Sequence, residues 1–317
     1  MKKHIILLIL ILGLITLFAK NSDAQARFFM PTEVGSSAEM IARGNIEGFS
    51  NTAEVLLENP ASLHTIKHFS VSAFTTTFMD EVTYQAVSIA LKTKKGVIGA
   101  AYMSAGVDDI TKTYQDQDEI TNPLGIIIPV GTFKYSTEVA KLSYQFSQTK
   151  RLHWGISGDY YVTTIDTVRG TGYNMDAGVK YDGKKLDMAL AIKNFLPGYD
   201  VSYTGGESDG KEEVLPAEIV FVSRYTLGPI NLFGQIKSGG RYDLVTKSGA
   251  ISYKPGFFPW IEFTAGYKEF GVLDTIETNT TLGVGLTLEN VKFNYALESS
   301  EHIEFDKKHY FSVGIKF

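Results

Sequence analysis

The last ten residues of the chain, Lys308 to Phe317, read K-H-Y-F-S-V-G-I-K-F and decide the prediction of its fold. Successive side chains of an extended strand point to opposite sides. One side of this strand is apolar and carries Phe311, Val313, Ile315 and Phe317. A strand of this kind fits the edge of a soluble sheet. It also fits the closing strand of a bacterial outer-membrane barrel, which leaves no open edge in lipid.

The N-terminus indicates export. Lys2 and Lys3 precede an apolar run over residues 5–18, and Ala24-Gln25-Ala26 has the small-x-small pattern of a signal peptidase site. The run is shorter than the roughly 20 residues of a membrane-spanning helix. We therefore predict a signal peptide over residues 1–26. Its removal takes away three lysines and one aspartate and changes the net charge from -5 to -7.

The composition favours many strands. The chain of 317 residues has 30 glycines, 17 tyrosines and 20 phenylalanines against nine prolines, as expected for strands joined by tight turns. It has no cysteine, which excludes a disulfide framework and a thiolate metal site. The acidic balance and the lack of a basic block argue against nucleic acid as a partner.

Residues 27–66 do not alternate between polar and apolar. They carry two short helical patterns, and the second ends at Asn59-Pro60-Ala61, because the residue before a proline is forced out of the helical region. We predict a helical hatch over 27–66, lying either as a plug inside a barrel or as a cap outside it.

From residue 67 to 317 the pattern has a period of two. The predicted strands cover residues 67–78, 82–92, 96–106, 137–148, 151–163, 172–182, 185–195, 215–227, 229–238, 244–254, 259–268, 278–288, 290–298 and 307–317. They are even in number, and most have about ten residues, the length that a tilted strand needs to cross a bilayer. The fold class predicted is all-β, a 14-stranded antiparallel transmembrane barrel with a short N-terminal hatch.

The connections between these strands fall into two sets. Short turns lie on the side of the two chain ends, and several long connections lie on the opposite side, as in outer-membrane barrels with short periplasmic turns. The first connection, 79–81, is a short exception on that opposite side. The long connections predicted are 107–136, 164–171, 196–214, 269–277 and 299–306. This sorting favours the barrel over a soluble sandwich.

The alternation also predicts the direction of the side chains. We expect a polar, lumen-facing set that includes Asp176, Lys180, Asp187, Lys193, Lys292 and Glu298. In the closing strand, Phe311, Val313 and Ile315 should face lipid and Lys316 the lumen, with the strand pairing to the one near Lys67. We expect the three lipid-facing residues, together with Phe317, to form the signal that the barrel assembly machinery recognises. Outer-membrane lipid and this machinery are the expected partners, and the outer membrane the expected location.

The longest predicted loop contains an apolar run with Leu124, Ile126, Ile127 and Ile128. Such a run suits an external docking patch or an entrance for a hydrophobic ligand. It equally suits a loop folded over the barrel mouth with these side chains packed inward, the arrangement that we favour.

Several short motifs resemble a known group. Residues 36–44, followed by Glu58-Asn59-Pro60-Ala61, resemble the hatch of FadL-like outer-membrane proteins, in which Asn-Pro-Ala follows two short helices. The segments 190–198, 215–218 and 263–268 are closer to the PorV/PorQ branch of that superfamily. The hatch departs from the family pattern at Asn51-Thr52-Ala53, where an Asp-Asp-Ala is usual.

The chain carries no recognisable catalytic motif. His64 and His68 have the i, i+4 spacing of metal ligands on a helix, but no third ligand is evident from the sequence. We therefore predict no enzyme, no cofactor and no metal site.

Two functions follow from the resemblance. The PorV/PorQ likeness implies an accessory barrel that docks secretion-system proteins or secreted proteins at the cell surface. The alternative is a FadL-type passive transporter of small hydrophobic molecules. The closer branch-level likeness favours the first.

Overall fold

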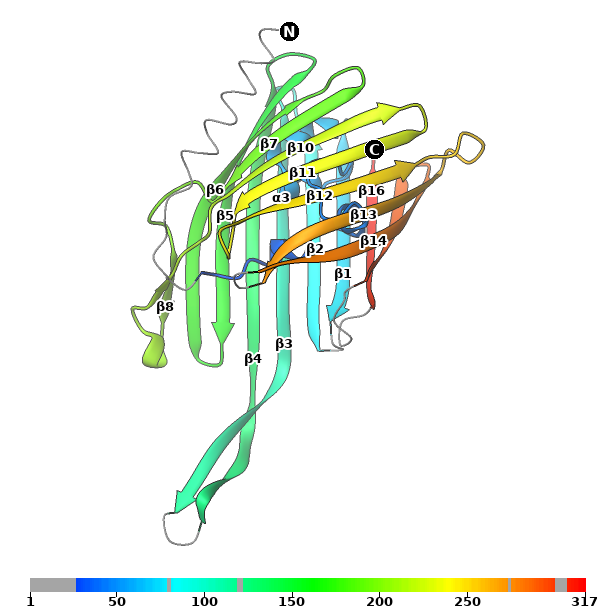
Figure 1. Ribbon diagram of the computed structural model, residues 1–317. Coiled ribbons are helices and arrows are strands. Elements are labelled where there is room, and N and C mark those ends of the chain that lie inside the picture. Colours follow the sequence, from blue (N-terminus) through cyan, green and yellow to red (C-terminus); the bar gives the residue numbers. More distant parts are fainter. Residues whose placement is uncertain (1–26, 79–80, 119–121, 273–274, 300–306) are drawn as a thin grey trace.

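The computed structural model describes residues 27–78, 81–118, 122–272, 275–299 and 307–317, so the predicted signal peptide lies outside the described residues. These residues form a closed antiparallel barrel around a short helical segment (Figure 1). Fourteen strands make the wall, as the sequence predicted. Among the described residues, no helix is long and apolar enough to cross a membrane.

The strands of the wall follow one another around the barrel in chain order. They are β1 Phe69–Phe78, β2 Val82–Lys92, β3 Val97–Asp118, β4 Asn122–Ser147, β5 Leu152–Ile165, β6 Val168–Tyr181, β7 Leu186–Lys193, β10 Glu218–Leu227, β11 Ile230–Gly239, β12 Leu244–Tyr253, β13 Ile261–Val272, β14 Thr275–Leu288, β15 Val291–Ser299 and β16 Lys307–Lys316. Two further short strands, β8 Val201–Thr204 and β9 Glu212–Glu213, lie with the 3-10 helix η3 Gly206–Ser208 in the connection between β7 and β10.

The barrel closes between its first and last strands. β16 pairs with β15 on one side and with β1 on the other, where Ser70 stands opposite Lys316 and Thr75 opposite Phe311. This confirms the predicted antiparallel pairing of the last strand with the one that begins near residue 67. No edge of the wall is left to pair with another chain.

The wall is polar inside and apolar outside. In β5, His153, Ser157 and Asp159 point inward and are buried. Trp154 and Tyr160, at alternate positions of the same strand, are 40% and 46% exposed on the outer surface. A soluble barrel would show the reverse. A polar interior with an apolar belt outside is the arrangement that a barrel in lipid needs.

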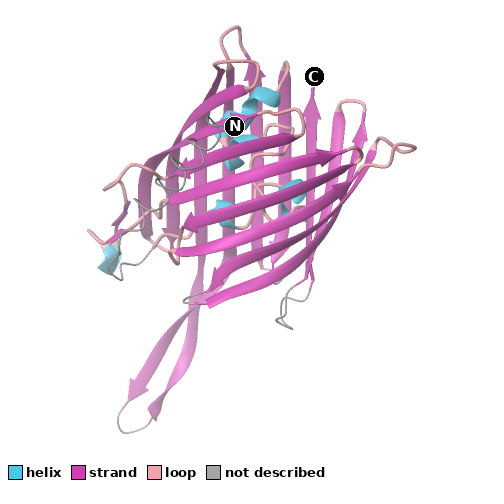
Figure 2. Ribbon diagram, turned by 45° about the horizontal axis from the view of Figure 1, so that its top comes forward, coloured by secondary structure: helices cyan, strands magenta, loops and turns pink. Residues whose placement is uncertain are grey.

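The strands on the side away from the chain ends are longer than predicted. Positions 107–118 and 122–136 are not loop: they extend β3 and β4 as paired strands that project well beyond the barrel body in both views (Figures 1 and 2). We call this extension the projecting hairpin. The residues 164–171 are also not a long loop, because β5 and β6 are joined by Asp166-Thr167, with Asp166 in the left-handed region at φ 54°. Where a strand extends beyond the apolar belt it no longer contacts lipid, so neither of its faces needs to be apolar. The alternation in the sequence therefore disappears, although the strands remain paired.

Of the other connections, 196–214 is confirmed as a long one, and 269–277 is mostly strand. Residues 300–306 of the last predicted loop lie outside the described residues.

Short helices fill the lumen near the end of the barrel that carries the C-terminus (Figures 1 and 2). They are η1 Pro31–Glu33, α2 Ala38–Ala42, α3 Val55–Glu58 and η2 Pro60–Thr65. We call residues 27–66 the hatch. Most of its apolar side chains, among them Ile41, Leu56 and Leu63, are buried and pack with inward-facing residues of the wall.

The Asn-Pro-Ala motif has a local explanation and a tertiary one. Asn59 is extended at φ -152°, as a residue before proline must be, and its side-chain oxygen accepts the backbone N–H of Ala61 at 2.9 Å. Its side-chain amide donates to the Leu190 carbonyl of β7 at 3.1 Å. The motif thus begins η2 and fixes it to the wall.

Two glycines of the wall make room for this motif. Gly155 of β5 and Gly178 of β6 stand opposite each other in the register. A Cβ on Gly155 would lie 2.3 Å from the backbone of Pro60 and Ala61, and one on Gly178 would lie 2.1 Å from the side-chain oxygen of Asn59. Both distances are far below van der Waals contact, so only glycine allows the hatch to lie this close.

Candidate functional site: a cavity between the hatch and the barrel wall

Ion pairs hold the hatch inside the barrel. Lys292 of β15 pairs with Glu39 of α2 at 2.7 Å, and Lys193 at the end of β7 pairs with Glu47 at 2.6 Å. Lys180 of β6 donates to the hatch carbonyl of Gly48 at 2.8 Å. These three lysines were predicted to face the lumen, and all are buried there against the hatch.

The other three residues of the predicted lumenal set are also buried in the interior and paired. Asp176 of β6 pairs with Lys141 of β4, and Asp187 accepts from Arg224 Nε at 3.0 Å. Glu298 accepts from Lys268 Nζ at 2.8 Å. The inward direction is as expected from the alternation. These groups are paired with opposing charges and do not face open water.

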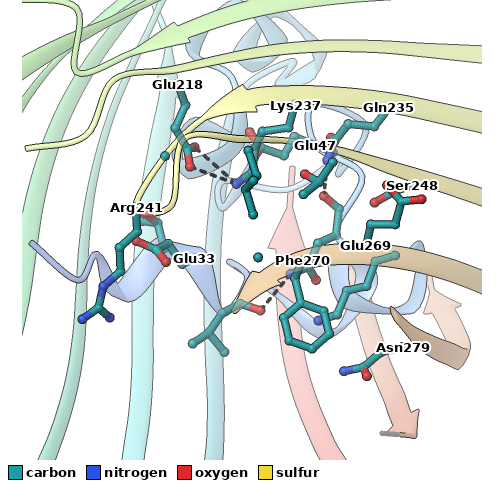
Figure 3. Close-up of a pocket in the computed structure, with 18 of the residues that line it drawn as sticks. Glu33, Glu47, Glu218, Gln235, Lys237, Arg241, Ser248, Glu269, Phe270 and Asn279 are labelled. Atoms are coloured by element: carbon teal, nitrogen blue, oxygen red, sulfur yellow. Dashed lines mark hydrogen bonds and ion pairs between the residues drawn. The ribbon is translucent and has the colours of Figure 1, made fainter. Parts of the chain in front are cut away.

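Behind the hatch, on the side away from the C-terminus, lies a cavity of about 270 Å³. Hatch residues around Phe29, Glu33 and Met40 line one side of it, and the far ends of β10 to β16 line the other. Figure 3 shows Glu33 of the hatch near Glu218, Lys237 and Phe270 of the wall. The connection 239–244 lies at its rim. This cavity is the candidate ligand site, and it faces the side that barrels of this kind present to the exterior.

The cavity has a charged wall built from two ion pairs. Lys237 of β11 lies 3.1 Å from Glu218 of β10, and Figure 3 shows this pair pointing into the cavity. Lys268 of β13 pairs with Glu298, which also accepts from Tyr310 Oη at 3.1 Å. Paired charges present a polar but nearly neutral surface to a ligand.

A second part of the cavity lining is aromatic. Phe29 of the hatch, Tyr242 and Phe270 line it, and the Arg241 guanidinium lies 5.7 Å from the ring centres of Phe29 and Tyr242. Aromatic faces and an adjacent cation bind flat apolar groups well. The cavity therefore suits a small molecule with an apolar body and a polar head.

Glu33 is a buried carboxyl group at the edge of this cavity. Burial raises the pKa of its carboxyl to about 7, and the neighbouring charge of Glu218 adds to the effect. The carboxyl accepts the backbone N–H of Met30 at 3.3 Å. The cavity is thus more negative above neutral pH than below it.

Gln235 of β11 joins the hatch to the cavity wall. Its side-chain oxygen accepts the backbone N–H of Glu47 at 3.0 Å, and its amide donates to the Asn45 carbonyl at 3.1 Å. Of these cavity residues, Glu298 alone belongs to the predicted lumen-facing set. Strand alternation places Glu218, Lys237 and Lys268 on the inner face, but no local pattern links them to Phe29 and Glu33, which lie some 200 residues away.

The predicted apolar run lies in the projecting hairpin, not over the barrel mouth. Ile127 and Ile128 of β4 are 69% and 41% exposed. The expectation that they pack inward is therefore wrong, because the hairpin carries them away from the barrel. Leu124 and Ile126 belong to the same strand, and their side chains lie outside the described part of the structure.

In the closing strand the predicted directions agree with the structure. Phe311 and Ile315 point outward and are 55% and 36% exposed, and Val313 lies on the same face, half-buried. Phe317 is 59% exposed next to Phe69. Lys316 points inward, where its ammonium lies 3.4 Å from the Asn51 side-chain oxygen of the hatch. The role of these residues as an assembly signal stays a prediction.

The fold is that of FadL-like outer-membrane barrels. The chain is similar to the CymD monoaromatic hydrocarbon channel, with a TM-score of 0.65 and 11% identity over 90% of this chain and 98% of that one. It is also similar to the Pseudomonas putida toluene transporter TodX, with a TM-score of 0.59 and 12% identity over 92% and 99%. A Pseudomonas aeruginosa FadL homologue gives 0.54 and 9% over 92% and 99%. Neither the protein-family models nor the curated proteins gave a match.

Proposed function

We propose that this protein is a passive FadL-type channel of the bacterial outer membrane for small molecules with an apolar, preferably aromatic, body. The observation that carries the proposal is the cavity of about 270 Å³ enclosed by the hatch and the outer ends of β10 to β14. A cavity of about 150 Å³ holds benzene, so this one has room for a substituted aromatic ring. The similar channels CymD and TodX are described as carrying monoaromatic hydrocarbons and toluene, which supports this class of substrate.

The charged pairs of the cavity refine the proposal. A pure hydrocarbon in the cavity would displace water from the Lys237–Glu218 pair and offer it no hydrogen bond in return, which costs free energy. A ring that carries a hydroxyl or amino group would satisfy it. We therefore expect p-cresol to be taken up better than toluene, and long-chain fatty acids to be excluded by the size of the cavity.

Uptake by proteoliposomes tests this function. Purified protein should raise the entry of labelled p-cresol above that of protein-free vesicles. Ser248 of β12 lines the cavity, so Ser248→Phe should reduce entry to the protein-free level. Val245→Phe is the matched control, because Val245 lies on the outer face of the same strand and is 49% exposed. Wild-type entry equal to that of empty vesicles would refute the proposal.

The projecting hairpin favours a second candidate function, a PorV/PorQ-type docking barrel. β3 and β4 have 22 and 26 residues, against 8 to 14 in the other barrel strands described. Their far parts expose Tyr114, Ile127 and Val130 by 56% or more. Apolar groups on a projecting hairpin suit a protein partner outside the cell.

Removal of the hairpin separates the two candidates. Val107 and Tyr135 are paired in the wall, so residues 108–134 can be replaced by an Asn-Gly turn. If docking is the function, a protein that co-purifies with the full chain from native membranes should be lost from this variant. Isolation of the full chain without any such protein would count against docking. If transport is the function, p-cresol entry should survive the deletion.

A further inference from the structure

Two histidines and an aspartate meet at the end of the barrel that carries the C-terminus. His64 lies in the last turn of the hatch helix η2. His153 lies at the start of β5, and Asp182 directly follows β6. Asp182 Oδ2 lies 2.6 Å from His64 Nε2 and 3.3 Å from His153 Nε2. The two imidazole rings are stacked, with their centres 3.7 Å apart. Three separate segments of the chain thus direct their ligand atoms to one point.

The hydrogen bonds of His64 determine where its lone pair lies. Its Nδ1 is 3.0 Å from the Ala61 carbonyl, which can only accept, so Nδ1 carries a proton. In the neutral ring, Nε2 then presents its lone pair to the Asp182 carboxylate at 2.6 Å. A lone pair and a carboxylate oxygen repel at this distance. A positive species, either a proton or a metal ion, must lie between them.

His153 faces the same carboxylate oxygen of Asp182, at 3.3 Å. His153 is only 5% exposed, and its Nε2 makes no hydrogen bond within the described part of the chain. Its Nδ1 is 2.8 Å from Ser147 Oγ, which also accepts from the Gln145 amide at 3.0 Å. Protonation of both stacked rings would place two like charges in contact. A metal ion satisfies all three groups together.

We propose that His64, His153 and Asp182 form a binding site for a divalent transition metal ion of the Zn²⁺ class. Two imidazole nitrogens and a carboxylate are ligands that Zn²⁺ accepts, whereas Ca²⁺ and Mg²⁺ prefer oxygen ligands alone. The three ligand atoms lie within 4.8 Å of one another. To reach the roughly 2.0–2.2 Å of a zinc bond, the two stacked rings would tilt toward a shared ion. The Ala61 carbonyl orients His64 from behind, as such second partners do in zinc sites.

The site is open to solvent on one side. The Asp182 side chain is 33% exposed, and with His64 it lines a depression of about 400 Å³ at the barrel end. Water can therefore complete the coordination of the ion. The nearby Lys180 does not occupy the site, because its ammonium donates to the Gly48 carbonyl and lies 4.9 Å from the centre of the Phe49 ring.

Metal binding here would join the hatch to the wall. His64 belongs to the hatch, whereas His153 and Asp182 belong to the barrel, so a bound ion bridges the two directly. The hatch should therefore be held more firmly with the metal than without it.

Zinc binding to the full-length, chelator-treated protein in detergent tests the proposal. Equilibrium dialysis near neutral pH should find about one ion per chain, and Co²⁺ in its place should give the visible absorption of a site with nitrogen ligands. Affinity should fall by about ten-fold or more in His153→Gln and in Asp182→Asn. His68→Gln is the matched control, since His68 is four residues from His64 but outside the cluster.

Two results would overturn the proposal. One is wild-type protein that binds no more zinc than His153→Gln, which would mean that protons alone neutralise the cluster. The other is an equal loss in His68→Gln. Each variant is first shown to be folded by its altered gel mobility without boiling. If His153→Gln fails to fold, Asp182→Asn alone decides, because its residue lies in a turn and is partly exposed.

Discussion

Phe69 and Phe317 are joined by a pair of backbone hydrogen bonds across the seam of the barrel. The Phe317 N–H donates to the Phe69 carbonyl at 2.8 Å, and the Phe69 N–H donates to the Phe317 carbonyl at 3.5 Å. Ser70 adds a side-chain bond from its Oγ to the Ile315 carbonyl at 2.8 Å. The last residue of the chain therefore completes the wall through its backbone, while its ring lies on the outer surface.

This separation predicts the effect of replacing Phe317. Phe317→Ala keeps the backbone pairing, so the stability of the folded barrel should change by no more than about 1 kcal/mol. If the barrel assembly machinery recognises the Phe317 ring, the amount of folded protein in outer-membrane fractions should fall markedly in this variant. Gel mobility with and without boiling measures that amount. Phe293→Ala, on the outer face of β15, is the control and should assemble normally.

A Cβ at Gly155 should displace the hatch. Gly155→Ala places a methyl group 2.3 Å from the Pro60 backbone, and overpacking of this kind costs about 1–3 kcal/mol. We expect faster hydrogen exchange in residues 56–65. Gly158→Ala in the same strand is the control, because nothing lies within 4 Å of the added methyl group. Equal exchange in both variants would contradict the close packing of the motif.

The buried cluster of Lys141, Asp159 and Asp176 should be sensitive to the loss of its cation. Lys141 Nζ lies 3.2 Å from Asp159 Oδ2 and also contacts Asp176, with all three side chains almost fully buried. Lys141→Met leaves two carboxylates without a cation and should cost about 3–5 kcal/mol, measured by urea unfolding in detergent micelles.

Two further variants check this explanation. A triple variant with Asp159→Asn and Asp176→Asn added should recover much of the loss, since no buried charge then remains. Lys112→Met removes a cation from an exposed pair with Asp166 and should cost no more than about 1 kcal/mol. A similar loss in both lysine variants would argue against burial as the cause.

The hatch should be held more firmly in acid than at neutral pH. Burial raises the pKa of the Glu58 carboxyl from 4.5 to about 7, although the carboxyl accepts the Gly48 N–H at 2.6 Å and the Ser36 hydroxyl at 3.2 Å. The folded state then binds a proton more tightly than the unfolded state. The contribution to stability is full below about pH 4.5 and is lost as the pH rises to about 7.

The size of this loss is at most about 3 kcal/mol. Hydrogen exchange of residues 48–62, corrected for the intrinsic rate, should show protection that declines between these two pH values. Glu58→Gln removes the ionisation and should flatten the profile. An increase of protection with pH in the wild type would contradict the predicted sign.

The sequence by itself determined the class of fold. Alternation with a period of two is a local property, and it located the strands of the apolar belt, the inward direction of residues such as Asp176 and Lys292, and the closing role of 308–317. The Asn59-Pro60-Ala61 motif likewise marked the end of a helix, because proline restricts its neighbour directly. Where the belt ends, as at Thr111 and Lys112, the alternation no longer distinguishes a strand from a loop, and the prediction failed there.

Only the tertiary structure decided what the interior does. Which charges pair, as Lys193 does with Glu47, depends on where the hatch lies in the lumen, and no local pattern fixes that position. The meeting of His64 with His153 and Asp182 depends on the register of β5 against β6, and the cavity depends on strands that converge from distant parts of the chain. Side-chain direction is set by neighbouring residues in sequence, whereas contact is set by neighbours in space.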